Sequence, residues 1–155
     1  LFDQNWFMTV SWSLQQNTEL GIRTRSIGTA TYGKFLIKEN QMQLAFSLGG
    51  AINNERYYRN DDGEQKPDQF NYEGVIKLRY RAFTNNEPEF NINPIFIVYP
   101  SITQPGRVRT DFNLESKLEL YHNIFISLTY YNQFDSRPPT SFYSSIIIYY
   151  VIDIK

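Results

Sequence analysis

Apolar and polar side chains alternate almost without interruption between Arg107 and Leu120. One set comprises Val108, Thr110, Phe112, Leu114, Ser116, Leu118 and Leu120, and the other comprises Arg109, Asp111, Asn113, Glu115, Lys117 and Glu119. Successive side chains of a β-strand point to opposite faces, so this segment predicts a strand with one apolar and one charged face. It is longer than the usual strand of about 5–6 residues, and it is long enough for the roughly 9–11 residues of a tilted strand that crosses a bilayer.

The same two-residue period recurs along the chain and predicts about eight strands divided by turn residues. We expect them at about 6–15, 19–36, 41–53, 70–83, 90–99, 107–120, 124–134 and 142–154. No segment keeps apolar residues at the helical period of about 3.6. Pro94 cannot donate to a ladder, so it predicts a bulge in the fifth strand.

This pattern is typical of an antiparallel, up-and-down transmembrane β-barrel with lipid outside and a polar lumen inside. We expect one such domain over residues 1–155. The longest apolar run, Ile146 to Ile152, is far shorter than the roughly 18 residues that suggest a membrane helix. Aromatic residues make up 17% of the chain, and aromatic girdles at the membrane surfaces would explain that content.

The alternation also assigns side chains to the two faces. The charged residues expected to face the lumen are Arg23, Arg25, Glu73, Lys77, Arg79, Arg81, Arg109, Asp111, Glu115, Lys117 and Glu119. The residues expected to face lipid are Trp6, Trp12, Leu44, Phe46, Ile76, Leu78, Phe112, Leu114, Leu118, Ile126, Leu128, Ile146 and Ile148. The lumen charges would either line a narrow pore and set its selectivity, or pair across strands and plug the interior.

Little in the chain points to catalysis or to a bound cofactor. There is no cysteine, and a net charge of −1 gives no field that would attract nucleic acid. Glu115 and Glu119 would stand about 13 Å apart on one strand, which is too far for a catalytic carboxylate pair. His122 fits a solvated turn, and the acidic residues within 61–64 fit a solvated loop better than a calcium site. We therefore expect no enzymatic activity, no metal and no cofactor.

Several short motifs, in this order and spacing, resemble one known family. They are Trp6-Phe7, the glycine-rich stretch from Gly28 to Gly33, Tyr99-Pro100-Ser101, Arg107-Val108-Arg109-Thr110-Asp111, Ile126-Ser127-Leu128-Thr129-Tyr130-Tyr131 and Asp135-Ser136-Arg137-Pro138-Pro139. The chain is similar to bacterial proteins described as salt-induced outer-membrane proteins, a domain family of unknown function. The resemblance implies an outer-membrane β-barrel. It also implies further strands ahead of this region, which would make the chain the C-terminal part of a barrel of about twelve strands.

The leading interpretation is a non-enzymatic protein of the bacterial outer membrane with a structural or accessory role or a narrow pore. Its expected partners are the lipid bilayer, lipopolysaccharide and other outer-membrane proteins of an envelope complex. The chain opens on Leu1 without a visible signal peptide, so we expect a mature or truncated chain. The alternative is a soluble lipocalin-like barrel that binds a small apolar ligand, with Phe112, Leu114 and Leu118 lining its pocket.

Overall fold

Eight β-strands make up nearly all of the part of the chain that the computed structural model describes. The described residues are 5–17, 22–57, 69–84, 86–121, 124–136 and 143–154. The strands are β1 (Trp6–Asn17), β2 (Ile22–Lys38), β3 (Met42–Tyr57), β4 (Gln69–Thr84), β5 (Phe90–Pro100), β6 (Val108–Tyr121), β7 (Ile124–Asp135) and β8 (Tyr143–Ile154). No helix among these residues is long and apolar enough to cross a membrane.

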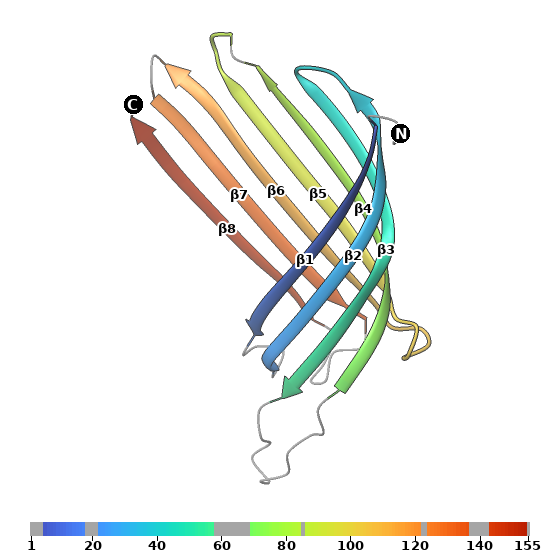
Figure 1. Ribbon diagram of the computed structural model, residues 1–155. Helices are drawn as coiled ribbons and strands as arrows, with labels where there is room; N and C mark the ends of the chain where they lie inside the picture. Colours follow the sequence, from blue (N-terminus) through green and yellow to red (C-terminus); the bar gives the residue numbers. More distant parts are fainter. Residues whose placement is uncertain are drawn as a thin grey trace.

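The strands form one antiparallel sheet in which each strand pairs with its neighbours in sequence (Figure 1). This confirms the predicted all-β, up-and-down architecture. Most strand bounds agree with the sequence pattern within about three residues. The third strand is the exception, because it was expected to end at Asn53 and continues to Tyr57. Within the described residues β1 and β8 do not pair with each other, so the sheet is open along this seam.

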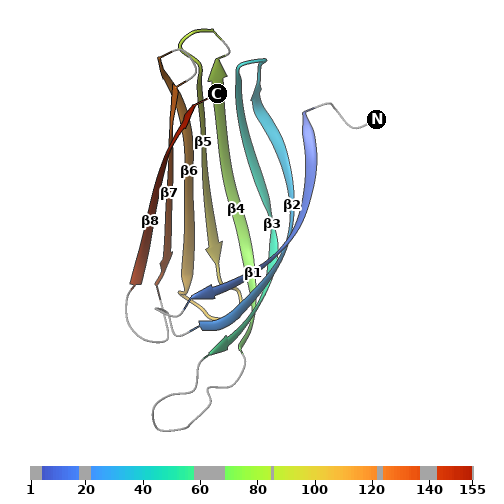
Figure 2. The ribbon, with the colours of Figure 1, turned by 90° about the vertical axis from the view of Figure 1, so that its left-hand side faces the viewer.

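The sheet is curved, and its two ends differ in width (Figures 1 and 2). The edge strands β1 and β8 approach each other where β1 finishes and diverge toward the end of β8. We call the end at which β1, β3, β5 and β7 finish the narrow end, and the opposite end the wide end. Register shifts in β1, β2 and β6 add local twist to this curvature.

The close contact between β2 and β3 depends on a glycine. A Cβ atom on Gly49 would lie 2.0 Å from the carbonyl oxygen of Ala30 in β2. A Cβ atom on the adjacent Gly50 would meet its nearest neighbour, the Glu73 carbonyl oxygen, only at 3.9 Å. Glycine lacks a Cβ and permits such an approach of two backbones, so position 49 requires glycine for this contact.

Cross-strand register divides the side chains between the two faces of the sheet. Directly opposed residues share a face, and one such row runs from Phe46 through Leu78 and Phe96 to Phe112. This is the convex face, where large apolar side chains are exposed, among them Met8 and Trp12 in β1 at 69% and 72%. Polar and charged side chains lie on the concave face, and many of them are buried.

Pro94 does not produce the predicted bulge. It lies opposite Leu114 of β6 in an unbroken register. Toward β4 the ladder is interrupted after Arg79 and Ile95, and it resumes in the same register at Ala82 and Ile92. The missing N–H of proline removes hydrogen bonds from the ladder, but no extra residue is inserted, which is why the prediction of a bulge was wrong.

Candidate functional site

Six charged side chains gather on the concave face at the narrow end. These residues, which we call the ionic cluster, are Arg25, Glu55, Glu73, Arg107, Arg109 and Asp135. Each is at most 2% exposed. Three guanidinium groups therefore meet three carboxylates, and the formal charges cancel. Charged side chains are rarely this buried unless they are paired, so the balance of charge is what allows the burial.

Arg107 connects strands from opposite sides of the curved sheet. Its Nε donates to Asp135 Oδ1 at 3.1 Å, and its Nη2 donates to Asp135 Oδ2 at 2.6 Å and to Glu55 Oε1 at 3.1 Å. Arg25 Nη2 of β2 lies 2.9 Å from Glu55 Oε1 and 3.7 Å from Asp135 Oδ2 of β7. Contacts between β2 and β7 can only cross the hollow of the sheet. At the narrow end the hollow of the sheet is therefore filled from one side to the other by these side chains.

Arg109 and Glu73 form a second, tightly bound part of the cluster. The Arg109 guanidinium donates from Nε to Glu73 Oε1 at 3.0 Å and from Nη2 to Oε2, which is the bidentate geometry that favours arginine over lysine. The same guanidinium lies 4.6 Å from the ring centre of Tyr99. Asn53 Nδ2 donates to Glu55 Oε1 at 2.8 Å and to Glu73 Oε1 at 3.4 Å, and so links the two parts.

The loop between β5 and β6 brings Arg107 to the cluster. Gly106 has a φ of 82°, a conformation that L side chains rarely adopt, and it turns the chain directly before Arg107. The Arg107 backbone N–H donates to the Gln104 carbonyl at 3.0 Å, and its Nη1 donates to Gln104 Oε1 at 3.2 Å. Thr103 Oγ1 donates to Asn71 Oδ1 of β4 at 3.2 Å and attaches the loop to the sheet.

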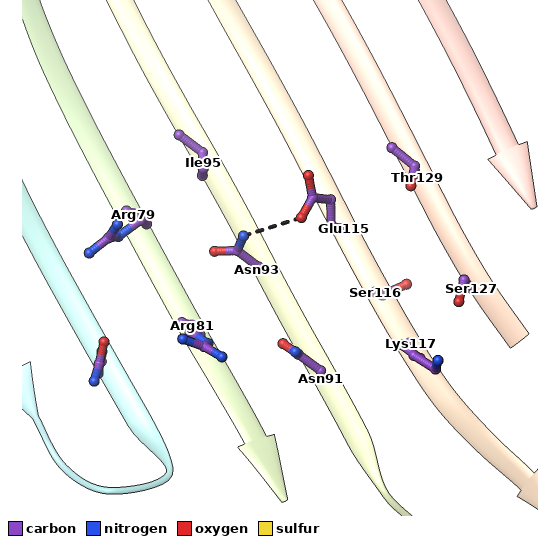
Figure 3. A pocket seen from close by; sticks show the side chains of 11 residues that line it. Arg79, Arg81, Asn91, Asn93, Ile95, Glu115, Ser116, Lys117, Ser127 and Thr129 are labelled. Carbon is purple, nitrogen blue, oxygen red and sulfur yellow. Dashed lines mark hydrogen bonds between the residues drawn. The ribbon is translucent and has the colours of Figure 1, made fainter. Parts of the chain in front are cut away.

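A polar cavity of about 500 Å³ lies toward the wide end (Figure 3). Its lining residues come from β3 to β7 and are Gln43, Arg79, Arg81, Asn91, Asn93, Ile95, Glu115, Ser116, Lys117, Ser127 and Thr129. Three of them carry a positive charge and one a negative charge. Glu115 accepts hydrogen bonds from Asn93 Nδ2 at 3.4 Å, drawn as a dashed line in Figure 3, and from Asn113 Nδ2 at 3.2 Å.

A smaller cavity of about 270 Å³ adjoins the polar cavity at the wide end. The two share Arg81, Asn91 and Lys117, and the smaller one adds three aromatic rings, Phe83, Phe90 and Phe125. The Arg81 guanidinium lies 5.1 Å from the Phe83 ring centre, and Lys117 Nζ lies 4.5 Å from that of Phe125. These contacts hold both cations at the junction of the two cavities.

A family model described as "Protein of unknown function, DUF481" matches residues 1–145. The chain belongs to this family. No curated protein and no solved structure matches the chain. The match confirms the predicted relationship to a domain family of unknown function. The predicted resemblance to salt-induced outer-membrane proteins stays a prediction.

The register places the charges predicted for the lumen of this DUF481 chain on the concave face, with one exception. Arg23 is exposed beside the register shift between Ile22 and Thr24. Arg25, Glu73 and Arg109 join the ionic cluster, and Arg79, Arg81, Glu115 and Lys117 line the polar cavity. Lys77 and Asp111 lie between the two regions in one cross-strand row, and Glu119 Oε2 accepts a hydrogen bond from the Glu89 backbone N–H at 3.0 Å. That the concave face encloses a lumen stays a prediction.

The residues predicted to face lipid lie on the convex face wherever their side chains are described. They belong to the cross-strand row from Phe46 to Phe112 or to parallel rows on either side of it. Ile146 and Ile148 belong to β8, but their side chains lie outside the described part of the structure. Contact of this face with lipid stays a prediction.

Sequence reasoning missed half of the ionic cluster. Glu55 was passed over because the third strand was expected to end at Asn53, although Ala51, Asn53 and Glu55 continue one alternation. Arg107 and Asp135 stood in the motifs of the family resemblance without an assigned role. His122 and the acidic residues within 61–64 lie outside the described residues. The described residues contain no group of three or more His, Cys, Asp or Glu side chains that could hold a metal ion.

Proposed function

We propose that this chain forms the wall of a β-barrel in the bacterial outer membrane, with a structural or accessory and non-enzymatic role. The observation that supports this proposal is the inverted distribution of side chains. The convex face exposes apolar residues from strand to strand, whereas the concave face buries arginines and carboxylates. Water-soluble monomers rarely expose continuous apolar areas of more than a few hundred Å², whereas a membrane barrel needs an apolar outer band.

The ionic cluster favours a plugged interior over an open pore. Its six side chains meet across the hollow of the sheet and leave almost no exposed surface at the narrow end. A barrel of about eight strands has an interior that side chains just fill, whereas wider barrels leave a channel. We therefore propose that the cavity at the wide end is blind.

The open seam supports the proposed partners. Backbone N–H and C=O groups cannot stay unpaired in hydrocarbon, so the edges of β1 and β8 must be paired within the membrane. Either β1 joins β8, or strands from elsewhere in the protein or from another outer-membrane protein fill the gap. Lipid and lipopolysaccharide would then cover the convex face.

The lipocalin-like alternative receives less support. It requires Phe112, Leu114 and Leu118 to line an interior pocket, but the register places Phe112 in the row of Leu78 and Phe96 on the convex face. The cavity inside the sheet is instead lined by amides, hydroxyls and charged groups.

Membrane fractionation followed by gel electrophoresis with and without boiling tests the proposal. We expect the protein in the outer-membrane fraction, with a mobility that shifts on boiling because a closed barrel resists detergent until it is heated. Recovery from the aqueous fraction as one unshifted species would overturn the proposal and make the convex face part of an interface.

A matched pair of substitutions tests which face meets lipid. Leu78 is 42% exposed and stands between Phe46 and Phe96 on the convex face. We expect Leu78→Arg to reduce insertion into lipid vesicles strongly, because arginine facing lipid costs about 2–4 kcal/mol near the midplane. Arg81→Gln on the concave face is the control and should insert like the wild type. Equal insertion of both variants would contradict the proposed orientation.

A further inference from the structure

We propose that the polar cavity binds a small hydroxylated organic anion, with Arg79 and Arg81 as its principal ligands. This inference goes beyond the proposed function and does not require a membrane, because the cavity is formed by the concave face in either environment. The observations that carry it are an imbalance of charge inside the sheet, the chemistry of the cavity lining and an open mouth.

The two regions of the concave face treat their cations differently. In the ionic cluster, the arginines lie against carboxylates at ion-pair distance. In β4, by contrast, the alternate positions 77, 79 and 81 place Lys77, Arg79 and Arg81 in succession on the concave face. The residues directly opposite these three in β3 and β5 are Ser47, Ala45, Gln43, Ile97 and Ile95, none of which is charged.

The carboxylate that lines the cavity does not neutralise these arginines. Glu115 belongs to β6, two strands from β4, and two strand spacings amount to about 10 Å. Its oxygens accept hydrogen bonds from Asn93 and Asn113. Among the described residues neither Arg79 nor Arg81 forms an ion pair. Two neighbouring guanidinium groups in a partly enclosed space favour an external anion, since each can bind a carboxylate or phosphate in a bidentate manner.

The rest of the lining indicates what carries the anionic group. Gln43, Asn91 and Asn93 offer amides, and Ser127 and Thr129 offer hydroxyls, whereas Ile95 is the apolar member of the lining. The Ser116 hydroxyl instead donates to the Leu128 carbonyl. Amides and hydroxyls can donate to and accept from the hydroxyls of a ligand. A volume of about 500 Å³ lies within the range of about 300–1,000 Å³ usual for small-molecule pockets. A sugar acid or a sugar phosphate has this combination of size, hydroxyls and charge.

The route into the cavity lies at the wide end. The smaller cavity shares Arg81 and Lys117 with the polar cavity and leads to the turn between β4 and β5. Its rings, Phe83 and Phe125, hold these two cations at the junction, where they outnumber Glu89, the carboxylate that lines the smaller cavity. The narrow end, by contrast, is filled by the neutral ionic cluster.

Isothermal titration calorimetry of the purified chain in detergent micelles tests the inference with four probes: galacturonate, glucose 6-phosphate, inorganic phosphate and glucose. We expect one molecule of galacturonate or of glucose 6-phosphate to bind per chain, and to bind more tightly than inorganic phosphate. Glucose should bind at least about tenfold more weakly, since it lacks the charge-assisted hydrogen bonds. Comparison of the first two probes shows whether carboxylate or phosphate is preferred.

Variants locate the binding. Arg79→Gln and Arg81→Gln should each weaken binding about tenfold or more, and the Lys variants at these positions should lose less, because charge is kept while the bidentate geometry is lost. Arg23→Gln makes the same change of charge at the narrow end and should bind like the wild type. An unchanged far-ultraviolet circular dichroism spectrum checks that each variant is folded.

Two results would overturn the inference: no binding of either organic anion, or binding that the substitutions at positions 79 and 81 leave unchanged. Equal affinity for glucose, or for inorganic phosphate, would also overturn it, because the anionic and the hydroxylated parts would then not both be recognised. If the variants do not fold, sulfate is tested as a competitor of glucose 6-phosphate for the wild-type chain. Competition would support Arg79 and Arg81 as ligands of the anionic group, and an absence of competition would overturn that assignment. The gel-mobility test of the membrane proposal is independent of all these outcomes.

Discussion

At the scale of single residues, the ionic cluster shows how arginines can be buried inside a sheet. Arg109 and Glu73 are at most 1% exposed and neutralise each other through two parallel hydrogen bonds. The gain from such a pair is offset by the cost of removing both charges from water. The pair therefore fixes the positions of both side chains more than it stabilises the fold. Either side chain alone would be a buried charge without a compensating partner.

Removal of one partner should accordingly cost more than removal of both. We expect Arg109→Met to lower the free energy of unfolding by about 3–5 kcal/mol and the double change with Glu73→Gln to restore most of that loss. Urea unfolding followed by the fluorescence of Trp6 and Trp12 measures both. Arg23→Gln, an exposed arginine, should change stability little. A double variant as unstable as the single one would show that the pair itself stabilises the fold.

Gly49 allows an equally local prediction. Gly49→Ala should destabilise the protein by about 1–3 kcal/mol, because its Cβ would overlap the Ala30 carbonyl and force β2 and β3 apart. Gly50→Ala is the control and should be tolerated, since its Cβ meets nothing closer than 3.9 Å. The midpoint temperature of the gel-mobility shift measures the difference. The same midpoint in both variants would contradict the close approach of the two backbones.

At the scale of strands, much of the structure could be predicted from the period of the side chains. The alternation in β6 assigned Phe112 and Asp111 to opposite faces, and the pairing of β6 with β5 bears out that division. The end of β3 could not be predicted in this way, because it carries polar residues on both faces and apolar and polar residues do not alternate there. For that reason Glu55 was missed. Register and curvature determine which side chains meet across the sheet. The alternation of side chains within one strand determines neither of them.

The cluster and the cavity illustrate the same limit. Sequence alone could place Arg25 and Arg79 on one face, but it could not tell that Arg25 stands directly opposite Glu55 of β3 and lies 3.7 Å from Asp135 of β7, while Arg79 has uncharged neighbours. The contact with Glu55 depends on the register of β2 and β3, and the contact with Asp135 depends on how far the sheet curls. In a flatter sheet Arg25 would keep Glu55 opposite it and lose Asp135.

At the scale of the whole molecule, the filled narrow end predicts how the protein behaves toward ions. In a planar bilayer we expect no steady conductance from the wild-type chain, because the ionic cluster closes the path between the two ends. Replacing Arg25, Arg107 and Asp135 together by alanine should open a conducting path. Single-channel recording measures both, with Arg23→Ala as the silent control. Steady conductance of the wild type would contradict a plugged interior.

The sequential order of the strands also has a consequence for how the chain folds. Each strand pairs with the strand that follows it in the chain, so every hairpin joins segments that are close in sequence and can form early. A join between β1 and β8 would bring together segments from opposite ends of the chain and would carry the largest loop-closure entropy. Closure should therefore be the slowest phase of refolding. A rate independent of protein concentration would indicate that the sheet closes on itself, and a rate that rises with concentration would indicate that a second chain fills the seam.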